Sequence, residues 1–372
     1  MTATQPPVRP PMRVLIVSGA LPPVSCGVGD YSASLARSLS ATGLAQIAVL
    51  TSSRADRTGA EPQLQGIARL EPISDWRLRS TPAAIAAVEK WQPDLLHIQF
   101  PSLGYDGPLV VPLSLWFRLG RRRPVVLTQH EKIVDPFLLP LIHSASAVVV
   151  VRPELAREEG GRFGFSLGAK ARLLIPNAPS LPLAERTPET VRLLRERYRI
   201  APGKAIVAYF GFLYPARGVD QLFEIASPEK HHLLIAGGPL AQAAGYHDRL
   251  TALAREPRWR GSATLTGFVP EREAAAILAG ADAVVLPFLS GGGTWSTSIQ
   301  GARLQGTFVL TTSTREWGYD PLRNLYCARP GDLGDLRAAL DRHLGTRLPG
   351  PAEDVPSWDQ IARRHLELYA SA

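Results

Sequence analysis

The stretch Ser290–Gly306 holds the residues best suited to bind an anion. Its three consecutive glycines, Gly291–Gly293, let backbone N–H groups converge, and a helix that begins just after them adds partial positive charge. Hydroxyl and indole side chains crowd the same turn: Thr294, Trp295, Ser296, Thr297 and Ser298. The hydroxyls suit a polyhydroxylated ligand. The stretch therefore predicts a pocket for a phosphate-bearing ligand, with an ordinary strand-to-helix turn capped by Ser or Thr as the alternative.

A second glycine pair, Gly27-Val-Gly29, opens an expected helix that runs through Leu39. Glycines at such a position let the backbone approach a phosphate or a sugar closely. The loop lacks the third glycine of the dinucleotide-binding fingerprint and is longer than that fingerprint allows. A nicotinamide-dependent enzyme is therefore disfavoured.

In the second half of the chain, the segment Tyr209–Asp220 places Arg217 beside a glycine that starts the next helix. A guanidinium at that position can form a bidentate contact with a diphosphate, although a plain surface arginine is the alternative. Two later turns, Ala236–Pro239 and Gly267–Glu271, offer backbone groups for a planar base.

These candidate residues follow short β-branched runs that alternate with helical stretches. In the first half we expect strands at 13–18, 46–51, 94–100, 124–130, 147–151 and 172–175. A second series follows at 205–210, 232–236, 263–268, 283–288 and 308–312. Strands separated by helices predict parallel, doubly wound sheets, in which ligands lie at the carboxyl ends of the strands.

The expected fold is α/β, with two Rossmann-like lobes facing across a cleft. Prolines interrupt the pattern between the two strand series, which indicates a hinge. Apolar residues at helical spacing from Trp358 to Tyr369 predict a closing helix. The expected boundaries are a flexible tail at 1–12, a first lobe at 13–178, a hinge region at 179–203, a second lobe at 204–355 and the closing helix at 356–372.

Composition limits the classes of function. The chain has 372 residues, 45% of them hydrophobic, which is enough for two cores. Its net charge is +8, and arginine rather than lysine supplies nearly all of the positive charge. The one dense basic run, Arg118–Arg123, has no interleaved aromatic residues. Nucleic-acid binding is therefore disfavoured. Because Trp116 and Phe117 precede that run, a weak membrane-surface contact is an alternative to a solvated helix end.

The two cysteines, Cys26 and Cys327, lie far apart in the sequence and suit a reduced compartment without a disulfide framework. No metal cluster can be built from them. The apolar run Val14–Val17 is too short for a signal sequence or a membrane span. We therefore expect a cytoplasmic protein, and the sequence leaves its oligomeric state open.

Taken in order, these motifs resemble the retaining GT-B glycosyltransferases related to glycogen synthase, the glycosyltransferase family 4-like group. The resemblance covers Arg13 to Tyr369 and rests on four stretches in sequence order: Gly27–Tyr31, Gly211–Asp220, Gly267–Val269 and Pro287–Gly306. It implies a nucleotide-sugar donor, UDP- or GDP-linked, that binds mainly to the C-terminal lobe. It also implies a sugar or small-molecule acceptor that binds mainly to the N-terminal lobe.

The resemblance further implies displacement at the anomeric carbon with retention, in which the leaving phosphate accepts the acceptor's proton. No metal and no other cofactor are required. His130 and Arg217 correspond to the catalytic positions, and Asp30, Tyr31 and Glu131 are the acceptor candidates. The donor-binding candidates are Gly27, Gly29, Gly211, Arg217, Gly267, Phe268, Gly292, Gly293, Thr294, Trp295, Ser296, Thr297 and Gln300.

The chain departs from the family at three positions. Gly292 and Gln300 stand where the family has two glutamates eight residues apart, the first on sugar hydroxyls and the second on the ribose. Phe212 stands where the family commonly has an arginine. A neutral amide gives a weaker hydrogen bond than a carboxylate. We expect either weaker donor binding or a retuned site, in which Gly292 leaves room for a bulkier donor.

Three alternatives to an ordinary transferase remain. A nucleotide-sugar 2-epimerase shares the fold, but the missing glutamates count against it. A pseudo-glycosyltransferase with a cyclitol-type donor fits an altered donor site. A non-catalytic nucleotide-sugar-binding protein fits the loss of both glutamates, whereas His130 and Arg217 argue against it.

Overall fold

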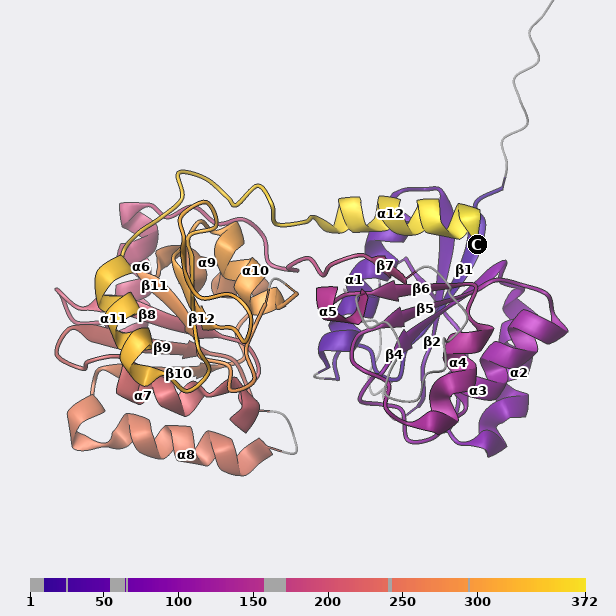
Figure 1. Cartoon of the computed structure of the whole chain (residues 1–372), viewed down its shortest axis with the longest axis horizontal. Coiled ribbons are helices and arrows are strands. Elements are labelled where there is room, and N and C mark those ends of the chain that lie inside the picture. The colour runs from indigo at the N-terminus through magenta and orange to yellow at the C-terminus, as the bar shows by residue number, and fades with distance from the viewer. Residues whose placement is uncertain are drawn as a thin grey trace, which may run out of the picture. The chain divides into compact units, whose positions relative to one another are not determined.

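The computed structural model describes residues 10–24, 26–53, 64, 66–156, 172–239, 243–293 and 295–372 (Figure 1). The chain divides into two compact units. Unit 1 combines Met1–Asn177 with Ser357–Ala372, and unit 2 is Ala178–Pro356. Most of the expected tail, residues 1–9, lies outside the described residues, and the expected hinge region at 179–203 falls within unit 2.

Unit 1 is built, in its described part, on a seven-stranded parallel sheet with the order β3-β2-β1-β4-β5-β6-β7. The strands are β1 Met12–Val17, β2 Ala45–Leu50, β3 Ala68–Arg69, β4 Leu95–Phe100, β5 Val125–Gln129, β6 Ala147–Val150 and β7 Arg172–Leu174. The central strands are buried along their whole length. Helices that cover both faces of a parallel sheet explain why these strands read as continuous apolar runs.

Unit 2 repeats this plan. Among its described residues, seven strands follow the order β10-β9-β8-β11-β12-β14-β13, and β13 pairs antiparallel with β14 at the edge. The strands are β8 Ala205–Phe210, β9 His231–Ala236, β10 Ala263–Gly267, β11 Ala283–Leu286, β12 Val309–Thr312, β13 Gly318–Asp320 and β14 Leu325–Ala328. Both sheets therefore reverse their winding direction next to the first strand of the unit.

Helices connect the strands in both units (Figure 1). In unit 1 they are α1 Gly27–Ala41, α2 Thr81–Trp91, α3 Val110–Leu115, α4 Leu139–Ser144, α5 Pro153–Ala156 and α12 Trp358–Ser371, with the short helices η2 Leu78–Ser80, η3 Trp116–Gly120 and η4 Pro136–Leu138. In unit 2 they are α6 Pro188–Tyr198, α7 Leu222–Ile225, α8 Ala244–Arg255, α9 Glu271–Gly280, α10 Thr297–Leu304 and α11 Leu333–His343, with η5 Pro215–Arg217, η6 Val219–Gln221 and η8 Pro257–Trp259. None of the helices in the described part of the chain is long and apolar enough to cross a membrane.

The C-terminal helix α12 belongs to unit 1, although unit 2 precedes it in the sequence. A capping box between Ser357 and Gln360 starts the helix. Its buried residues Ile361, His365 and Tyr369 recur at helical spacing, so one face points into the unit. The helix packs against α1, and in Figure 1 it is the yellow helix beside the strands of unit 1.

The eleven strands expected from the sequence are all present, with ends that differ by one or two residues. The sequence reading missed β3, β13 and β14. These strands are two to four residues long and largely half-buried or exposed, so their apolar pattern is weak. The doubly wound α/β prediction is confirmed.

Glycine lets β8 and β9 approach closely where they leave the sheet of unit 2. The backbone of Gly237 has a φ of 148°, and a Cβ added there would lie 1.9 Å from the carbonyl oxygen of Gly211. A side chain therefore requires a backbone shift, because the obstacle is itself main chain.

We expect Gly237→Ala to lower the free energy of unfolding of unit 2 by at least about 2 kcal/mol, through overpacking against backbone. The measurement is thermal or urea unfolding. Gly350→Ala is the matched control, since a Cβ at Gly350 meets no atom within 4 Å. Equal stability of the two variants would contradict the close approach described here.

Candidate functional site

The loops that follow β8 and β11 meet at the point where the sheet of unit 2 reverses its winding direction. The amide of Leu289 donates to the carbonyl of Ala216 at 3.0 Å. A Cβ on Gly218 would lie 2.2 Å from the carbonyl oxygen of Pro287. In open α/β sheets this reversal point opens the crevice in which ligands bind. Unit 2 thus has a candidate ligand site between these two loops.

Arg217 lies at this reversal point, and within the described part of the chain no ion pair joins it to an acidic residue. Its guanidinium carbon stacks 4.7 Å from the ring centre of Phe288 and 5.2 Å from that of Tyr214. Its Nε is buried and has no hydrogen-bond partner among the described residues. Aromatic stacking fixes the plane of the guanidinium but leaves N–H donors unsatisfied. Arg217 is therefore oriented and available for an anionic ligand.

The glycine loop after β11 is filled by its own aromatic residues. A Cβ on Gly292 would lie 2.5 Å from the ring of Phe288, and one on Gly293 would lie 1.9 Å from the ring of Trp295. The expectation that Gly292 leaves room for a bulkier donor is therefore wrong. The glycine is required because the Phe288 ring, which also supports Arg217, occupies that space.

The start of α10 closes the site on one side. Ser296 precedes the helix, and its side chain makes no capping hydrogen bond. A Cβ on Gly211, at the end of β8, would lie 3.0 Å from the hydroxyl of Ser298. The structure thus brings Gly211, Arg217, Gly292 and the first turn of α10 into one region. Thr297 is exposed there, and Thr294 lies outside the described residues.

Gln300 is 2% exposed and is held by a second arginine. Its Oε1 accepts a hydrogen bond from the guanidinium of Arg303 at 3.3 Å. Arg303 is itself 1% exposed, forms an ion pair with Asp354 and donates from Nε to the carbonyl of Arg323 at 3.3 Å. The amide at position 300 is therefore part of a buried polar cluster that includes Arg303.

An exposed aromatic surface borders the site at the ends of β8 and β10. The ring of Phe268 is 63% exposed and lies over Gly238, where a Cβ would come within 2.2 Å of it. Phe212 meets Phe268 edge to face at 6.0 Å between ring centres. The adjoining Gly267 accepts a hydrogen bond from the amide of Gly237 at 3.0 Å. An exposed aromatic face of this kind can stack on a planar base.

Unit 1 has a corresponding reversal point between β1 and β4, and side chains tie its two loops together. Ser102 accepts a hydrogen bond from the amide of Ala20 at 3.1 Å. Tyr105 donates to the carbonyl of Gln99 at 2.9 Å. The helix α1 starts beside these loops, because a Cβ on Gly29 would lie 2.9 Å from the carbonyl oxygen of Ala20. Asp30 is half-buried in the first turn of α1, and Gly27 is exposed.

His130 follows β5 and is 7% exposed. Tyr31 packs edge-on against it with ring centres 4.8 Å apart, and Trp358 packs against the other side of Tyr31 at 5.2 Å. Burial lowers the pKa of His130 to about 3, and the charge of Arg152 adds to the effect. The imidazole is therefore neutral at physiological pH. Glu131 forms an ion pair with Arg152 and is exposed.

Sequence reasoning missed the polar residues beneath His130. His97 and Gln99 on β4, and Thr128 on β5, are fully buried within strands whose other residues, apart from Gln129, are apolar. Polar residues two positions apart share one face of a strand. The alternation in Leu95–Phe100 and Val125–His130 was therefore the available signal. Phe288 and Arg303 in unit 2 were missed as well.

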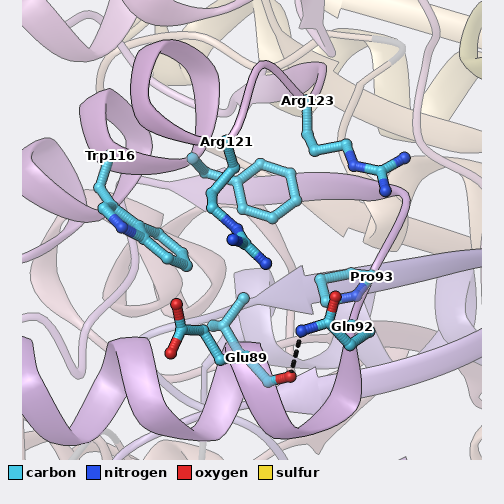
Figure 2. Close-up of a pocket in the computed structure, with 8 residues that line it drawn as sticks. Glu89, Gln92, Pro93, Trp116, Arg121 and Arg123 are labelled. Atoms are coloured by element: carbon cyan, nitrogen blue, oxygen red, sulfur yellow. Dashed lines mark hydrogen bonds between the residues drawn. The ribbon is translucent and has the colours of Figure 1, made fainter.

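A small depression, shown in Figure 2, lies at the opposite edge of the sheet of unit 1. It is lined by Val88, Glu89, Gln92, Pro93, Trp116, Phe117, Arg121 and Arg123. Arg121 stacks on Trp116 at 5.7 Å, and Arg123 lies 3.5 Å from Asp94. These residues come just before β4 and β5, at the amino ends of the strands. The depression is therefore separate from His130, which lies at the carboxyl ends.

No protein-family model matches the chain, and no curated protein matches it in sequence. Solved structures do match its fold. HepE from Anabaena, in a complex with UDP-glucose, has a TM-score of 0.74 at 16% identity, over 97% of this chain and 100% of that one. Sucrose-phosphate synthase from Thermosynechococcus elongatus has a TM-score of 0.70 at 18% identity, over 97% and 98%. A glycosyltransferase from Rickettsia africae has a TM-score of 0.75 at 16% identity, over 97% and 98%. The chain has the GT-B fold.

The buried histidines of unit 1 make its stability depend on pH. Burial lowers the pKa of His130 to about 3 and that of His365 to about 4, and it holds the pKa of His97 well below its ordinary value. Below about pH 6.5 the unfolded chain binds protons that the folded unit excludes. The free energy of unfolding therefore decreases as the pH is lowered, by up to about 1.4 kcal/mol per pH unit for each histidine.

We expect His365→Leu to flatten the decline between pH 6.5 and pH 4 by up to about 1.4 kcal/mol per pH unit. The measurement is urea unfolding at a series of pH values. Hydrogen exchange in peptides from β4 and β5 reports the unfolding of unit 1. Leu366→Ala, on the same helix, changes the absolute stability without changing the slope. An unchanged slope in His365→Leu would show that this histidine does not remain neutral in the folded unit.

Proposed function

We propose that the protein is a glycosyltransferase that transfers a sugar from a nucleotide-diphosphate donor to a sugar or small-molecule acceptor, with retention and without a metal. The observation that carries this proposal is the oriented Arg217 at the reversal point of unit 2. The GT-B fold supports it, as does the complex of the similar HepE with UDP-glucose.

The diphosphate is the group that Arg217 suits best. A half-buried guanidinium with an unsatisfied Nε carries a desolvation cost that an anionic ligand offsets. The planar fork can contact two phosphate oxygens at once. The start of α10 adds first-turn N–H groups that Ser296 does not cap through its side chain. These groups can stabilise the negative charge that develops on the leaving diphosphate.

We assign the binding of the nucleotide base to the aromatic surface around Phe268. Phe212, which stands where the family commonly has an arginine, contacts Phe268 rather than adding a second cation. The donor pocket thus has one stacked arginine and an apolar wall. This arrangement supports a uridine or guanosine donor bound through stacking and backbone groups.

His130 is assigned to the reacting sugar in unit 1. Its depressed pKa makes it a neutral hydrogen-bonding group, with no imidazolium charge beside the anomeric carbon. In the retaining mechanism the leaving phosphate accepts the proton of the acceptor hydroxyl, so no protein carboxylate is needed as a nucleophile. The acceptor would meet Asp30 and Glu131, whereas the buried Tyr31 serves as a wall for His130.

A pseudo-glycosyltransferase with a cyclitol-type donor is the second candidate, and the Phe288 ring favours it. An apolar ring fills the space beside Gly292, where the family has a glutamate for sugar hydroxyls. A donor with fewer or differently placed hydroxyls loses less at such a wall than a hexose does.

The proposal is tested first with a panel of nucleoside diphosphates. We expect one or two of them to raise the melting temperature with and without a chelator, because a ligand at 100 times its Kd stabilises by about 2.7 kcal/mol. Free nucleoside diphosphate should then be released from the matching sugar donor only after an acceptor is added. Binding without acceptor-dependent release would indicate a binding protein, and the absence of any shift at millimolar nucleotide would contradict the donor site.

Arg217→Ala should weaken the binding of the best nucleoside diphosphate ten- to a hundredfold, equivalent to about 1.4 to 2.7 kcal/mol, in calorimetry. The corresponding nucleoside should bind both forms equally. Arg329→Ala is the matched control, because Arg329 also stacks on an aromatic ring, Trp317, at 4.7 Å in the same unit. An equal loss for nucleoside and diphosphate would place Arg217 away from the phosphates.

A further inference from the structure

A chain of buried polar side chains connects His130 to the C-terminal helix within unit 1. His130 Nε2 lies 3.0 Å from Gln99 Oε1, and Gln99 Nε2 lies 3.0 Å from His97 Nε2. His97 Nδ1 lies 2.6 Å from the hydroxyl of Tyr369 on α12. All four residues are less than 10% exposed. Bulk water therefore does not compete for these hydrogen bonds, and their directions must be mutually consistent.

The direction can be read from groups that only donate or only accept. The amide nitrogen of Gln99 donates, so His97 Nε2 is an acceptor. Thr128 Oγ1 also lies 2.7 Å from the same nitrogen, and a hydroxyl there can act as a donor when that nitrogen carries no proton. His97 is neutral because burial lowers its pKa, so its proton is on Nδ1 and is donated to Tyr369.

The carbonyl end of the Gln99 amide determines the tautomer of His130. The carbonyl oxygen of Gln99 can only accept, so Nε2 of His130 carries the proton. The neutral ring then presents Nδ1 as its acceptor atom. A neutral histidine in this tautomer accepts a hydrogen bond from a ligand hydroxyl and gives none at that nitrogen.

We propose that Gln99 is a positioning residue that fixes the Nε2–H tautomer of His130, and that Tyr369 on α12, by accepting the proton of His97 Nδ1, stabilises this direction of the Gln99 amide. The ligand group at Nδ1 of His130 is a hydroxyl that donates its proton, as a sugar hydroxyl does. This last assignment rests on the proposed function, whereas the tautomer relay does not.

The chain admits a second self-consistent arrangement with every direction reversed. In it Tyr369 donates to His97 Nδ1, His97 Nε2–H donates to Gln99 Oε1, and the Gln99 amide donates to His130 Nε2. His130 would then carry its proton on Nδ1. One rotation of the Gln99 amide therefore exchanges an acceptor for a donor at Nδ1 of His130, and the hydrogen bond between His97 and Tyr369 reverses with it.

Nitrogen-15 NMR of the full-length protein, with long-range ring correlations, reports the tautomer of each histidine directly. The signals of His97 and His130 are assigned by their loss in His97→Asn and His130→Asn. We expect His97 as Nδ1–H and His130 as Nε2–H in the unsubstituted protein, with the His130 ring proton protected from solvent exchange. The opposite pair of tautomers would overturn the proposal.

Three variants separate positioning from simple structural support. Gln99→Leu should leave His130 as a mixture of tautomers with a rapidly exchanging ring proton. Gln99→Glu should keep His130 as Nε2–H but convert His97 to Nε2–H, because a carboxylate accepts from both rings. Tyr369→Phe should shift His130 toward Nδ1–H without touching it. Tyr105→Phe is the control. Among the described residues its hydroxyl donates to the main-chain carbonyls of Val17 and Gln99 and not to the Gln99 amide side chain, so both tautomers should stay unchanged.

Unaltered tautomers and exchange in Gln99→Leu, or an unaltered His130 in Tyr369→Phe, would overturn the corresponding half of the proposal. Activity gives an independent readout. With a donor and acceptor in hand, Gln99→Leu should lower kcat at least about tenfold with the donor KM within about twofold, and Gln99→Glu should restore part of kcat. If the tautomers behave as expected and no transfer occurs with any donor, the proposed function fails while the relay stands. If transfer occurs and the tautomers do not respond, only the relay fails.

Discussion

The parallel pairing of β8 with β11 is the constraint on which the chemistry of unit 2 depends. Each strand must return through a crossover to the same end of the sheet, and the two crossovers leave in opposite directions. No crossover passes over the carboxyl ends of these two neighbouring strands. The loops after β8 and β11 therefore converge there. The contact of Gly218 with Pro287 and the hydrogen bond from Leu289 to Ala216 follow from this geometry. Arg217 is half-buried and stacked between Tyr214 and Phe288 because it lies where the sheet reverses.

The packing around Gly292 and Gln300 involves residues other than the two glutamates of the resembled family. At position 292, where the resembled family has a carboxylate, the ring of Phe288 packs over the glycine and also stacks with Arg217. Without one at position 300, the amide of Gln300 joins Arg303, whose charge is balanced by Asp354. The two departures from the family pattern are thus accompanied by defined local packing.

The fold was accessible from the sequence because buried parallel strands are continuous apolar runs, as in Ile206–Tyr209 and Val284–Leu286. The loops at their carboxyl ends could be selected for the same reason. The packing within those loops was not accessible. Whether Gly292 opens or fills a space depends on the rotamer of Phe288, and the partner of His97 is Tyr369, 272 residues away. Local patterns do not encode contacts of that range, although the polar alternation on β4 marks where one is needed.

The placement of α12 has a consequence for biosynthesis. Unit 1 is discontinuous in the sequence, because Ser357–Ala372 completes a body whose other residues precede unit 2. A ribosome therefore translates the whole of unit 2 before it releases the helix that supplies Tyr369 and Trp358. Until then Tyr31 lacks its ring contact with Trp358, and His97 lacks its hydrogen bond with Tyr369. The nascent chain can bury the sheet of unit 1 early, but its histidine network is completed only by residues synthesised after unit 2.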